Sequence, residues 1–182
     1  MSRRDIRLFG DPVLRSRARP VEDFDASLGR LVRDLTETLV DAGGAGLAAP
    51  QIGVGLRVFV FARPDPEGAR TGVIGHLVNP VLVEQSTDTV EDREGCLSFP
   101  GLEYQLSRAR RVTARGFDQH GEPQVVEGTE RLARCLAHET DHLDGVLFID
   151  RLDPDVRKLA MAEIRERILS GEDITVKTSP HR

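Results

Sequence analysis

The sequence contains few cysteines and no long run of apolar residues. Only two cysteines occur among 182 residues. The opening residues, Met1 to Asp5, are followed by no apolar stretch typical of a signal peptide or a membrane-spanning helix. We therefore expect a cytoplasmic protein without a membrane partner. Its cysteines should stay reduced and be available as metal ligands.

Concentrated charge of one sign is also missing. Lys and Arg number 25 against 30 Asp and Glu, for a net charge of -5, and no dense basic run predicts binding to nucleic acid. The glycine-rich stretch from Gly44 to Gly53 lacks the Gly-Lys-Ser/Thr ending of a phosphate loop. It also does not follow a strand, as a dinucleotide fingerprint would. These absences argue against the nucleotide-binding and nucleic-acid-binding classes.

The remaining pattern predicts a single α+β domain over residues 1–170 and a flexible tail over 171–182. A chain of this length with 39% hydrophobic residues can bury one sizeable core and is too short to need two. Strand-like runs at 57–62, 76–84, 109–118 and 124–127 are separated by turn signals, which predicts mainly antiparallel sheet. The mostly acidic stretch at 88–94 is interpreted as a solvated loop.

Helical patterns lie on both sides of these strands. Asp11 and Pro12 are typical of the start of a short helix that reaches about Arg17. A second helix over 25–41 is indicated by leucines three and four residues apart, at Leu28, Leu31, Leu35 and Leu39. A third helix begins near Thr129, whose hydroxyl would cap it, and a final helix covers 155–169. The third helix is expected at the centre of the fold because it carries a metal-binding pattern.

That pattern is His-Glu-Thr-Asp-His, from His138 to His142, and it matches H-E-x-x-H. On a helix, His138 and His142 lie on the same face, so both imidazoles can bind one metal ion. Glu139 would lie beside them and accept a proton from water. A catalytic divalent metal usually has three protein ligands and one open position. The two histidines therefore need a third ligand.

Several residues are candidates for this third ligand. Phe148 occupies the position of the last histidine of the metzincin pattern, which argues against that class. Glu163 on the final helix fits a thermolysin-like site, so a metalloprotease remains an alternative. Cys135 shares the helix face but lies about 10 Å from His142 along the axis, and we expect it to pack beside the site. Cys96, next to a glycine that permits close backbone approach, is the preferred ligand.

One polar side chain in the glycine-rich stretch also fits catalysis. Gln51 could donate a hydrogen bond to an oxyanion that develops at the metal. The alternative is a glutamine that only satisfies the backbone of its own loop. The residues alone leave both interpretations open.

Three segments together resemble the peptide deformylase family. They are Gly44-Ala45-Gly46-Leu47-Ala48-Ala49-Pro50-Gln51, Glu94-Gly95-Cys96-Leu97-Ser98 and His138-Glu139-Thr140-Asp141-His142, in the family's order. The similarity covers nearly the whole chain. It implies a monomeric enzyme that hydrolyses the N-formyl group from N-formylmethionine at the amino terminus of newly made polypeptides and releases formate. The implied partners are nascent chains at the ribosome exit.

The same resemblance implies roles for individual residues. One divalent metal ion would be held by Cys96, His138 and His142. Fe(II) is the usual ion, and Zn, Ni or Co are substitutes. Glu139 would be the proton shuttle.

Further residues would bind the substrate or support the ligands. The developing oxyanion would be met by the Gln51 side chain and the Leu97 backbone N–H. Gly46 and Gly95 would hold the substrate main chain. The carboxylates of Glu94 and Asp141 would fix the orientation of loop and ligands, as metal-bound histidines generally require.

Two departures from the family pattern concern the metal helix. Ala137 replaces the glutamine that commonly precedes the first histidine. Arg131 and Arg134 lie on the helix turns that, in relatives, help to line the pocket for the methionine side chain. The aliphatic stems of arginines can still cover apolar surface. These two arginines leave open a deformylase specialised for another N-formyl compound.

Overall fold

The computed structural model describes residues 3–63 and 73–170, so the predicted tail at 171–182 lies outside the described residues. The α-helices are α1 (Ala26–Ala42), α2 (Glu130–Leu143) and α3 (Pro154–Leu169). Short 3₁₀ helices are η1 (Pro12–Arg15), η2 (Ala49–Ile52) and η3 (Phe148–Arg151). The strands are β1 (Gly46–Ala48), β2 (Val58–Ala62), β3 (Ile74–Gln85), β4 (Thr89–Cys96), β5 (Phe99–Ala109), β6 (Arg111–Phe117) and β7 (Pro123–Thr129).

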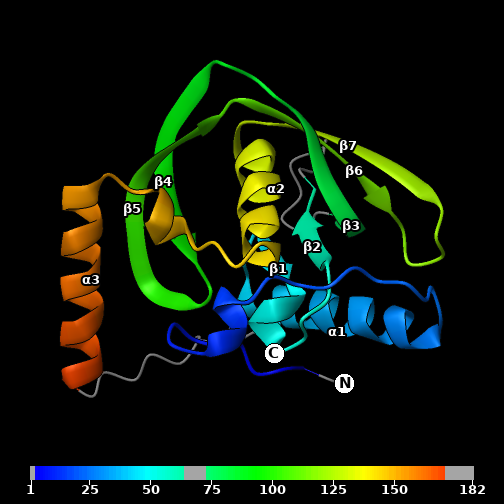
Figure 1. Cartoon of the computed structure of the whole chain (residues 1–182), viewed down its shortest axis with the longest axis horizontal. Helices are drawn as coiled ribbons and strands as arrows, with labels where there is room; N and C mark the ends of the chain where they lie inside the picture. Colours follow the sequence, from blue (N-terminus) through cyan, green and yellow to red (C-terminus); the bar gives the residue numbers. More distant parts are fainter. Residues whose placement is uncertain (1–2, 64–72, 171–182) are drawn as a thin grey trace.

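The strands form two antiparallel sheets with α2 between them. One sheet has the order β1-β2-β3-β6-β7, and β4 pairs with β5 in a separate hairpin. Figure 1 shows the long strands β3, β6 and β7 arching over α2, with the β4–β5 hairpin on its other side and α3 outside the hairpin. The predicted α+β fold, mainly antiparallel around the metal helix, is confirmed.

The four predicted strands correspond to β2, β3, β6 and β7, whereas the hairpin was missed. Residues 88–94 do not form a solvated loop, since most of them belong to β4. The error has a physical reason. The strand consists mainly of polar residues and only Glu94 is buried in it, so no run of apolar residues marks it. Strand β1 was also not predicted, because it lies within the glycine-rich stretch.

Helix α1 covers nearly the predicted range of 25–41, whereas the cap predicted at the start of α2 differs from the one observed. The Asp25 carboxylate accepts from the backbone N–H of Ser27 at 2.8 Å, and α1 ends at Gly43 with φ of 67°, as expected for a left-handed C-cap. At α2 the Thr129 hydroxyl makes no capping hydrogen bond with the described residues. Instead, Glu130 N donates to Arg110 O at 2.8 Å. The end of the neighbouring strand therefore takes over part of the capping.

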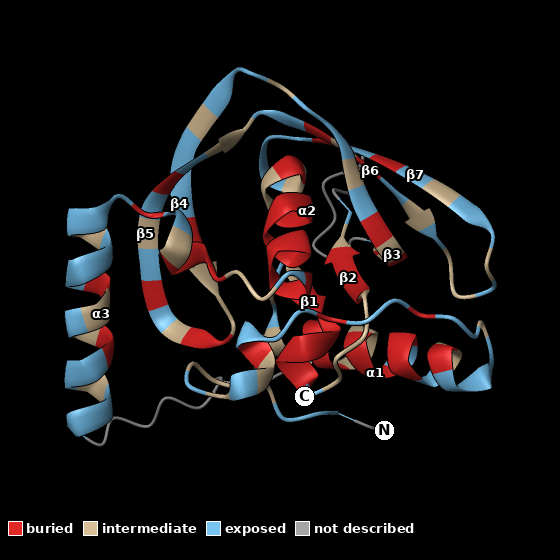
Figure 2. Ribbon diagram, in the orientation of Figure 1, coloured by how far each residue is buried: buried red, intermediate tan, exposed pale blue. Residues whose placement is uncertain are grey.

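The core consists of three clusters, and α2 contributes four buried residues to one of them, while it also contacts strands of both sheets. The four leucines of α1 are buried against β1 and β2, as predicted. Most of α2 is buried and only its first turn reaches the surface (Figure 2). The hairpin packs on η3 and α3 through a third cluster that includes Phe99, Phe148 and Ile164. Both sheets thus reach α2, which fixes the helix in the middle of the molecule.

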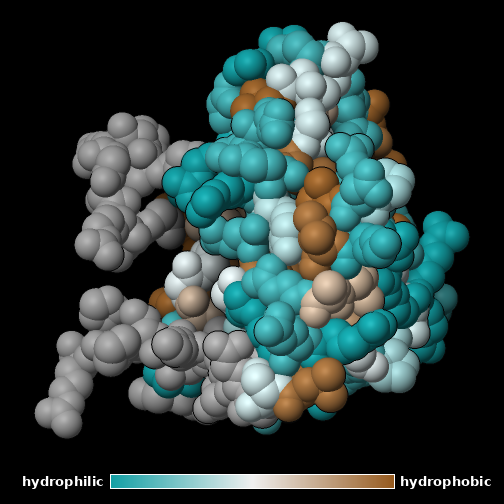
Figure 3. Space-filling model, turned by 90° about the vertical axis from the view of Figure 1, so that its left-hand side faces the viewer, coloured by the Kyte–Doolittle hydropathy of each residue, from teal (hydrophilic) through white to brown (hydrophobic). Residues whose placement is uncertain are grey.

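The surface on the side of α3 is mostly hydrophilic, with separate hydrophobic groups between the polar ones (Figure 3). On α3 itself, Leu159, Ile168 and Leu169 are exposed. Among the residues that the structure describes, no helix has the length and apolarity needed to cross a membrane.

The turn after α2 is expected to require glycine at position 145. Gly145 has a φ of +73°, and a Cβ there would lie 2.6 Å from the carbonyl oxygen of Arg15. Gly145→Ala should therefore lower the free energy of unfolding by about 1–3 kcal/mol, measured by chemical denaturation. Gly29→Ala is the control: it lies within α1, where no atom is within 4 Å of the added Cβ, and should raise stability by about 0.5–1 kcal/mol. A Gly145→Ala protein as stable as the wild type would contradict this account.

Candidate metal centre

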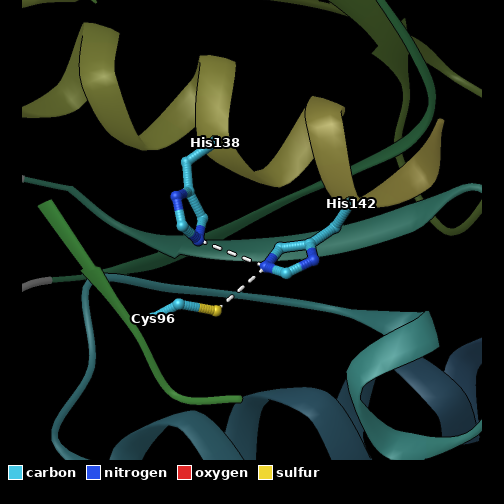
Figure 4. Close-up of side chains that lie close together, drawn as sticks. All are labelled: Cys96, His138 and His142. Atoms are coloured by element: carbon cyan, nitrogen blue, oxygen red, sulfur yellow. Dashed lines mark hydrogen bonds between the residues drawn. The ribbon is translucent and has the colours of Figure 1, made fainter. Parts of the chain in front are cut away.

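The structure brings Cys96, His138 and His142 together in space. Cys96 is the last residue of β4, and the two histidines lie one turn apart on α2. The Cys96 sulfur is 3.2 Å from His142 Nε2, which is 3.2 Å from His138 Nε2, and all three atoms point toward one another (Figure 4). Within the described ranges these residues form the group that could hold a metal ion.

The donor set and its spacing fit a tetrahedral metal site. Bonds of 2.0–2.3 Å at tetrahedral angles separate ligand atoms by roughly 3.4–3.6 Å. Two of the observed separations are 3.2 Å, and all three atoms lie within 4.8 Å of one another. His138 Nδ1 donates to Glu94 Oε1 at 2.7 Å, and this bond leaves the lone pair of Nε2 facing the centre. A thiolate and two neutral imidazole nitrogens suit zinc or iron. The residues present therefore fit one divalent ion.

Glu139 lies beside this group with a carboxylate oxygen that has no partner. Glu139 is buried, and its Oε2 has no hydrogen bond with the described residues. Burial raises the pKa of Glu139 to about 7, against the opposing charge of His138 and with reinforcement from Glu94. The other oxygen faces Gly46, where an added Cβ would overlap the carboxylate and lie 2.8 Å from the Cys135 sulfur. Glycine at position 46 thus leaves room for the carboxylate.

A cavity of about 670 Å³ opens over these residues. Every residue expected to bind substrate lines it, together with two of the expected ligands and the proton shuttle: Gly46, Gln51, Gly95, Cys96, Leu97, His138 and Glu139. The cavity is thus bordered by β1 and η2, the hairpin and α2. Arg131 and Arg134 line it as well, as expected for residues near a side-chain pocket.

Gln51 is held with its amide nitrogen toward the metal centre. Its Oε1 accepts from Ala48 N at 2.9 Å, and its Nε2 lies 3.2 Å from Ser98 Oγ and 3.5 Å from the Cys96 sulfur. Both interpretations of Gln51 therefore describe part of its environment. One end satisfies its own loop, while the other is a donor within the site.

Behind the histidines, Glu94 connects the hairpin to α2. Its carboxylate accepts from His138 Nδ1, from Arg108 at 2.6 and 3.0 Å and from Arg134 at 2.8 Å. Burial alone would raise the pKa of Glu94, but the hydrogen bonds from His138 and Arg108 lower it. Glu94 is therefore a carboxylate that holds the His138 ring in place.

Asp141 is connected to the metal ligands indirectly, through other side chains. Its carboxylate accepts from Arg108 at 2.8 Å and from Arg151 at 2.6 Å, and its hydrogen bonds to Arg108 connect it to the network of Glu94. Arg108 was not among the predicted residues. It has no motif near it in the sequence, and only the pairing of β4 with β5 brings it to Glu94.

The alternative ligand Glu163 is occupied elsewhere. Its carboxylate accepts from Tyr104 Oη at 2.7 Å and from Arg167 at 2.6 Å, on the side of the hairpin that faces α3. Cys135, the other cysteine, is buried and donates to Ala45 O at 3.3 Å. The expectation that it packs beside the site is confirmed.

Replacing Glu94 should weaken metal binding. In Glu94→Gln the amide keeps an acceptor for His138 but directs N–H groups at arginines, so the ring is held less firmly. We expect metal affinity to fall about 10–100-fold, measured by competition with a chelator. Glu103→Gln is the matched control because Glu103 lies on the adjacent strand and is exposed. Equal affinity in Glu94→Gln and the wild type would contradict the role of Glu94.

The chain is similar to known proteins over most of its length. A family model described as polypeptide deformylase matches residues 3–158. A peptide deformylase of Acidothermus cellulolyticus is 60% identical over 181 residues, which is 100% of this chain and 96% of that protein. Peptide deformylase 1 of Corynebacterium glutamicum is 52% identical over 165 residues, 91% of this chain and 96% of that protein.

Solved structures extend the agreement to the fold. A peptide deformylase from Legionella pneumophila superposes with a TM-score of 0.82 at 41% identity, covering 94% of this chain and 99% of that one. A plant peptide deformylase superposes with a TM-score of 0.85 at 33% identity, covering 100% and 98%. Sequence and fold match over nearly the full length, and this chain therefore belongs to the polypeptide deformylase family.

Proposed function

We propose that this chain hydrolyses the formamide bond of N-formylmethionine at the amino terminus of newly made polypeptides, which yields formate and a free amine. The observation that carries the proposal is the convergence of Cys96, His138 and His142 beside the buried, unpartnered Glu139 carboxylate. The family assignment narrows the substrate from amides in general to formylated peptides.

Cys96, His138 and His142 would hold one divalent ion, and Fe(II) is the ion proposed, with Zn, Ni or Co as substitutes. When bound, such an ion supplies Lewis-acid chemistry that polarises a carbonyl and makes water more acidic. Glu139 would take a proton at Oε2 and deliver it to the nitrogen that leaves. This oxygen has no hydrogen-bond partner among residues 3–63 and 73–170, so it is available for both steps.

The substrate would be positioned by groups that line the cavity. Nε2 of Gln51 and the backbone N–H of Leu97 would donate to the oxyanion. In the part of the chain that the structure describes, β1 lies at the end of its sheet and β4 pairs only with β5. The strands that carry Gly46 and Gly95 therefore each have an edge without a partner strand, and both glycines line the cavity. An extended peptide could pair with these edges as an added strand.

The cellular setting follows from this substrate. We place the enzyme in the cytoplasm, acting on nascent chains as they leave the ribosome exit. We propose that it acts as a monomer. Residues 1–170 would form the catalytic domain.

The test is formate release from N-formyl-Met-Ala-Ser by Fe(II)-loaded protein handled without oxygen. Glu139→Gln should reduce the rate about 10²–10⁴-fold because the proton shuttle is lost, while the metal is retained. Cys96→Ser should lower metal content together with activity. Glu163→Gln separates the metalloprotease alternative, because loss of metal in this variant would favour Glu163 as a ligand. Wild-type protein that binds iron but releases no formate would overturn the proposal.

A second measurement tests the space around the proton shuttle. Gly46→Ala places a methyl group where the Glu139 carboxylate lies and should displace it. We expect kcat to fall about 10²-fold, as for a displacement of about 1 Å, with metal content unchanged. Gly55→Ala is the control because nothing lies within 4 Å of its added Cβ. Unchanged kcat in Gly46→Ala would show that Glu139 does not need this position.

A specialised deformylase is the second candidate, and it is favoured only by the arginines in the cavity wall. Arg134 donates to Glu94 and to Val90 O at 2.9 Å, so its charge is largely satisfied. Arg131 is exposed at the same wall. In the assay above, a formylated substrate turned over faster than N-formyl-Met-Ala-Ser would favour this candidate.

A further inference from the structure

The hairpin that carries Cys96 is irregular at its tip. Gly95 pairs with Glu103, yet the next residue, Cys96, pairs with Phe99. The three residues between Phe99 and Glu103 therefore have no partner on β4 and form a bulge on β5. A bulge of this kind bends its strand and re-aims neighbouring side chains, and bulges are common next to active sites.

The tip delivers two groups to the proposed reaction, the Cys96 sulfur and the Leu97 N–H. One side of the tip is held by the N-terminal segment and η2. Phe9 N donates to Ser98 O at 3.0 Å, and Gln51 Nε2 donates to Ser98 Oγ at 3.2 Å. The bulge lies on the other side of the tip and must be held separately.

Arg167 of α3 contacts the bulge directly. Its Nη1 donates to Pro100 O at 3.1 Å and its Nη2 to Gly101 O at 3.2 Å. Gly101 has a φ of +74°, so the backbone bends at the point where Arg167 contacts it. A guanidinium offers two parallel N–H groups, which suits two neighbouring carbonyls. The unpaired bulge is thus satisfied from the C-terminal helix.

A second contact orients the guanidinium. Glu163, one turn before Arg167 on α3, accepts from Arg167 Nη2 at 2.6 Å and from the hydroxyl of Tyr104 at 2.7 Å. Tyr104 lies on β5 just beyond the bulge. Arg167 and Glu163 therefore hydrogen-bond to β5 at the bulge and immediately after it. Arg167 also lines the cavity, so this contact forms part of the cavity wall.

We propose that Arg167 is a positioning residue that holds the β5 bulge and thereby aims the Cys96 sulfur and the Leu97 N–H at the metal centre. The inference rests on the proposed function and deepens it, since it makes α3 part of the catalytic apparatus. Arg167 itself touches no reacting atom. Without it the bulge carbonyls turn to water, and the bulge is left with the packing of Leu102 in the third core cluster.

The test combines kinetics with a spectroscopic readout of the thiolate. In Arg167→Ala we expect kcat for N-formyl-Met-Ala-Ser to fall about tenfold while KM changes little, because the lost alignment matters mainly in the transition state. Metal-free protein titrated with cobalt(II) should show a shifted or weakened charge-transfer absorption from the Cys96 thiolate. Arg167→Lys keeps one donor and should recover part of both signals.

Arg165→Ala is the matched control, because it removes an exposed arginine from the same helix. It should leave kcat and the cobalt spectrum unchanged. The proposal is overturned if Arg167→Ala keeps wild-type kcat and spectrum, or if Arg165→Ala alters them equally. It is also overturned if only the melting temperature falls. The cobalt spectrum is independent of turnover, so a wild type that releases no formate would defeat the proposed function and leave the positioning of Cys96 testable.

Discussion

The buried carboxylate of Glu94 is the contact on which the site depends. An unpaired carboxylate in the interior costs several kcal/mol, so Glu94 requires the cations that surround it, and these come from both β5 and α2. In a strand, residues two apart share a face. Glu94 and Cys96 therefore both face α2, where one binds Nδ1 of His138 and the other approaches the Nε2 side of the histidines. One strand thus fixes both the ring and the sulfur opposite it.

The hairpin could not hold this position alone. An isolated two-stranded sheet is at best marginally stable in water, and β4 contributes only one buried residue, Glu94. Its stability comes from the buried face of β5, where Phe99 contacts Phe148 at a ring-centroid distance of 5.4 Å and Phe9 at 5.0 Å. The ligand from the hairpin and the ligands from α2 are thus joined through the core and through the charges of Glu94. For this reason stability and metal geometry are coupled in this fold.

Local patterns predicted the parts of the molecule whose structure is set locally. The leucine spacing of α1 acts within a few residues, so the sequence shows it directly. The H-E-x-x-H spacing fixes a helix face in the same way. Arg108 could not be found, because its role depends on strand pairing and its neighbours in sequence are unremarkable. The predicted capping of α2 failed for a similar reason: the carbonyl of Arg110, between β5 and β6, accepts the N–H of the first helical residue. Interactions between distant segments overrode a correct local signal.

Two buried polar atoms without hydrogen bonds lie in the proposed reaction site, where they reduce stability but can serve the reaction. Buried polar groups are nearly always hydrogen-bonded, yet Glu139 Oε2 and His142 Nδ1 have no partner in the described residues. The neighbouring carboxylates and arginines make hydrogen bonds, so the two unsatisfied atoms do not result from a general lack of partners in this region. Gly46 removes the side chain that would otherwise fill the space beside Glu139. A buried acceptor with open space beside it is unfavourable for folding alone. It becomes useful when a substrate or water that carries a proton enters the cavity.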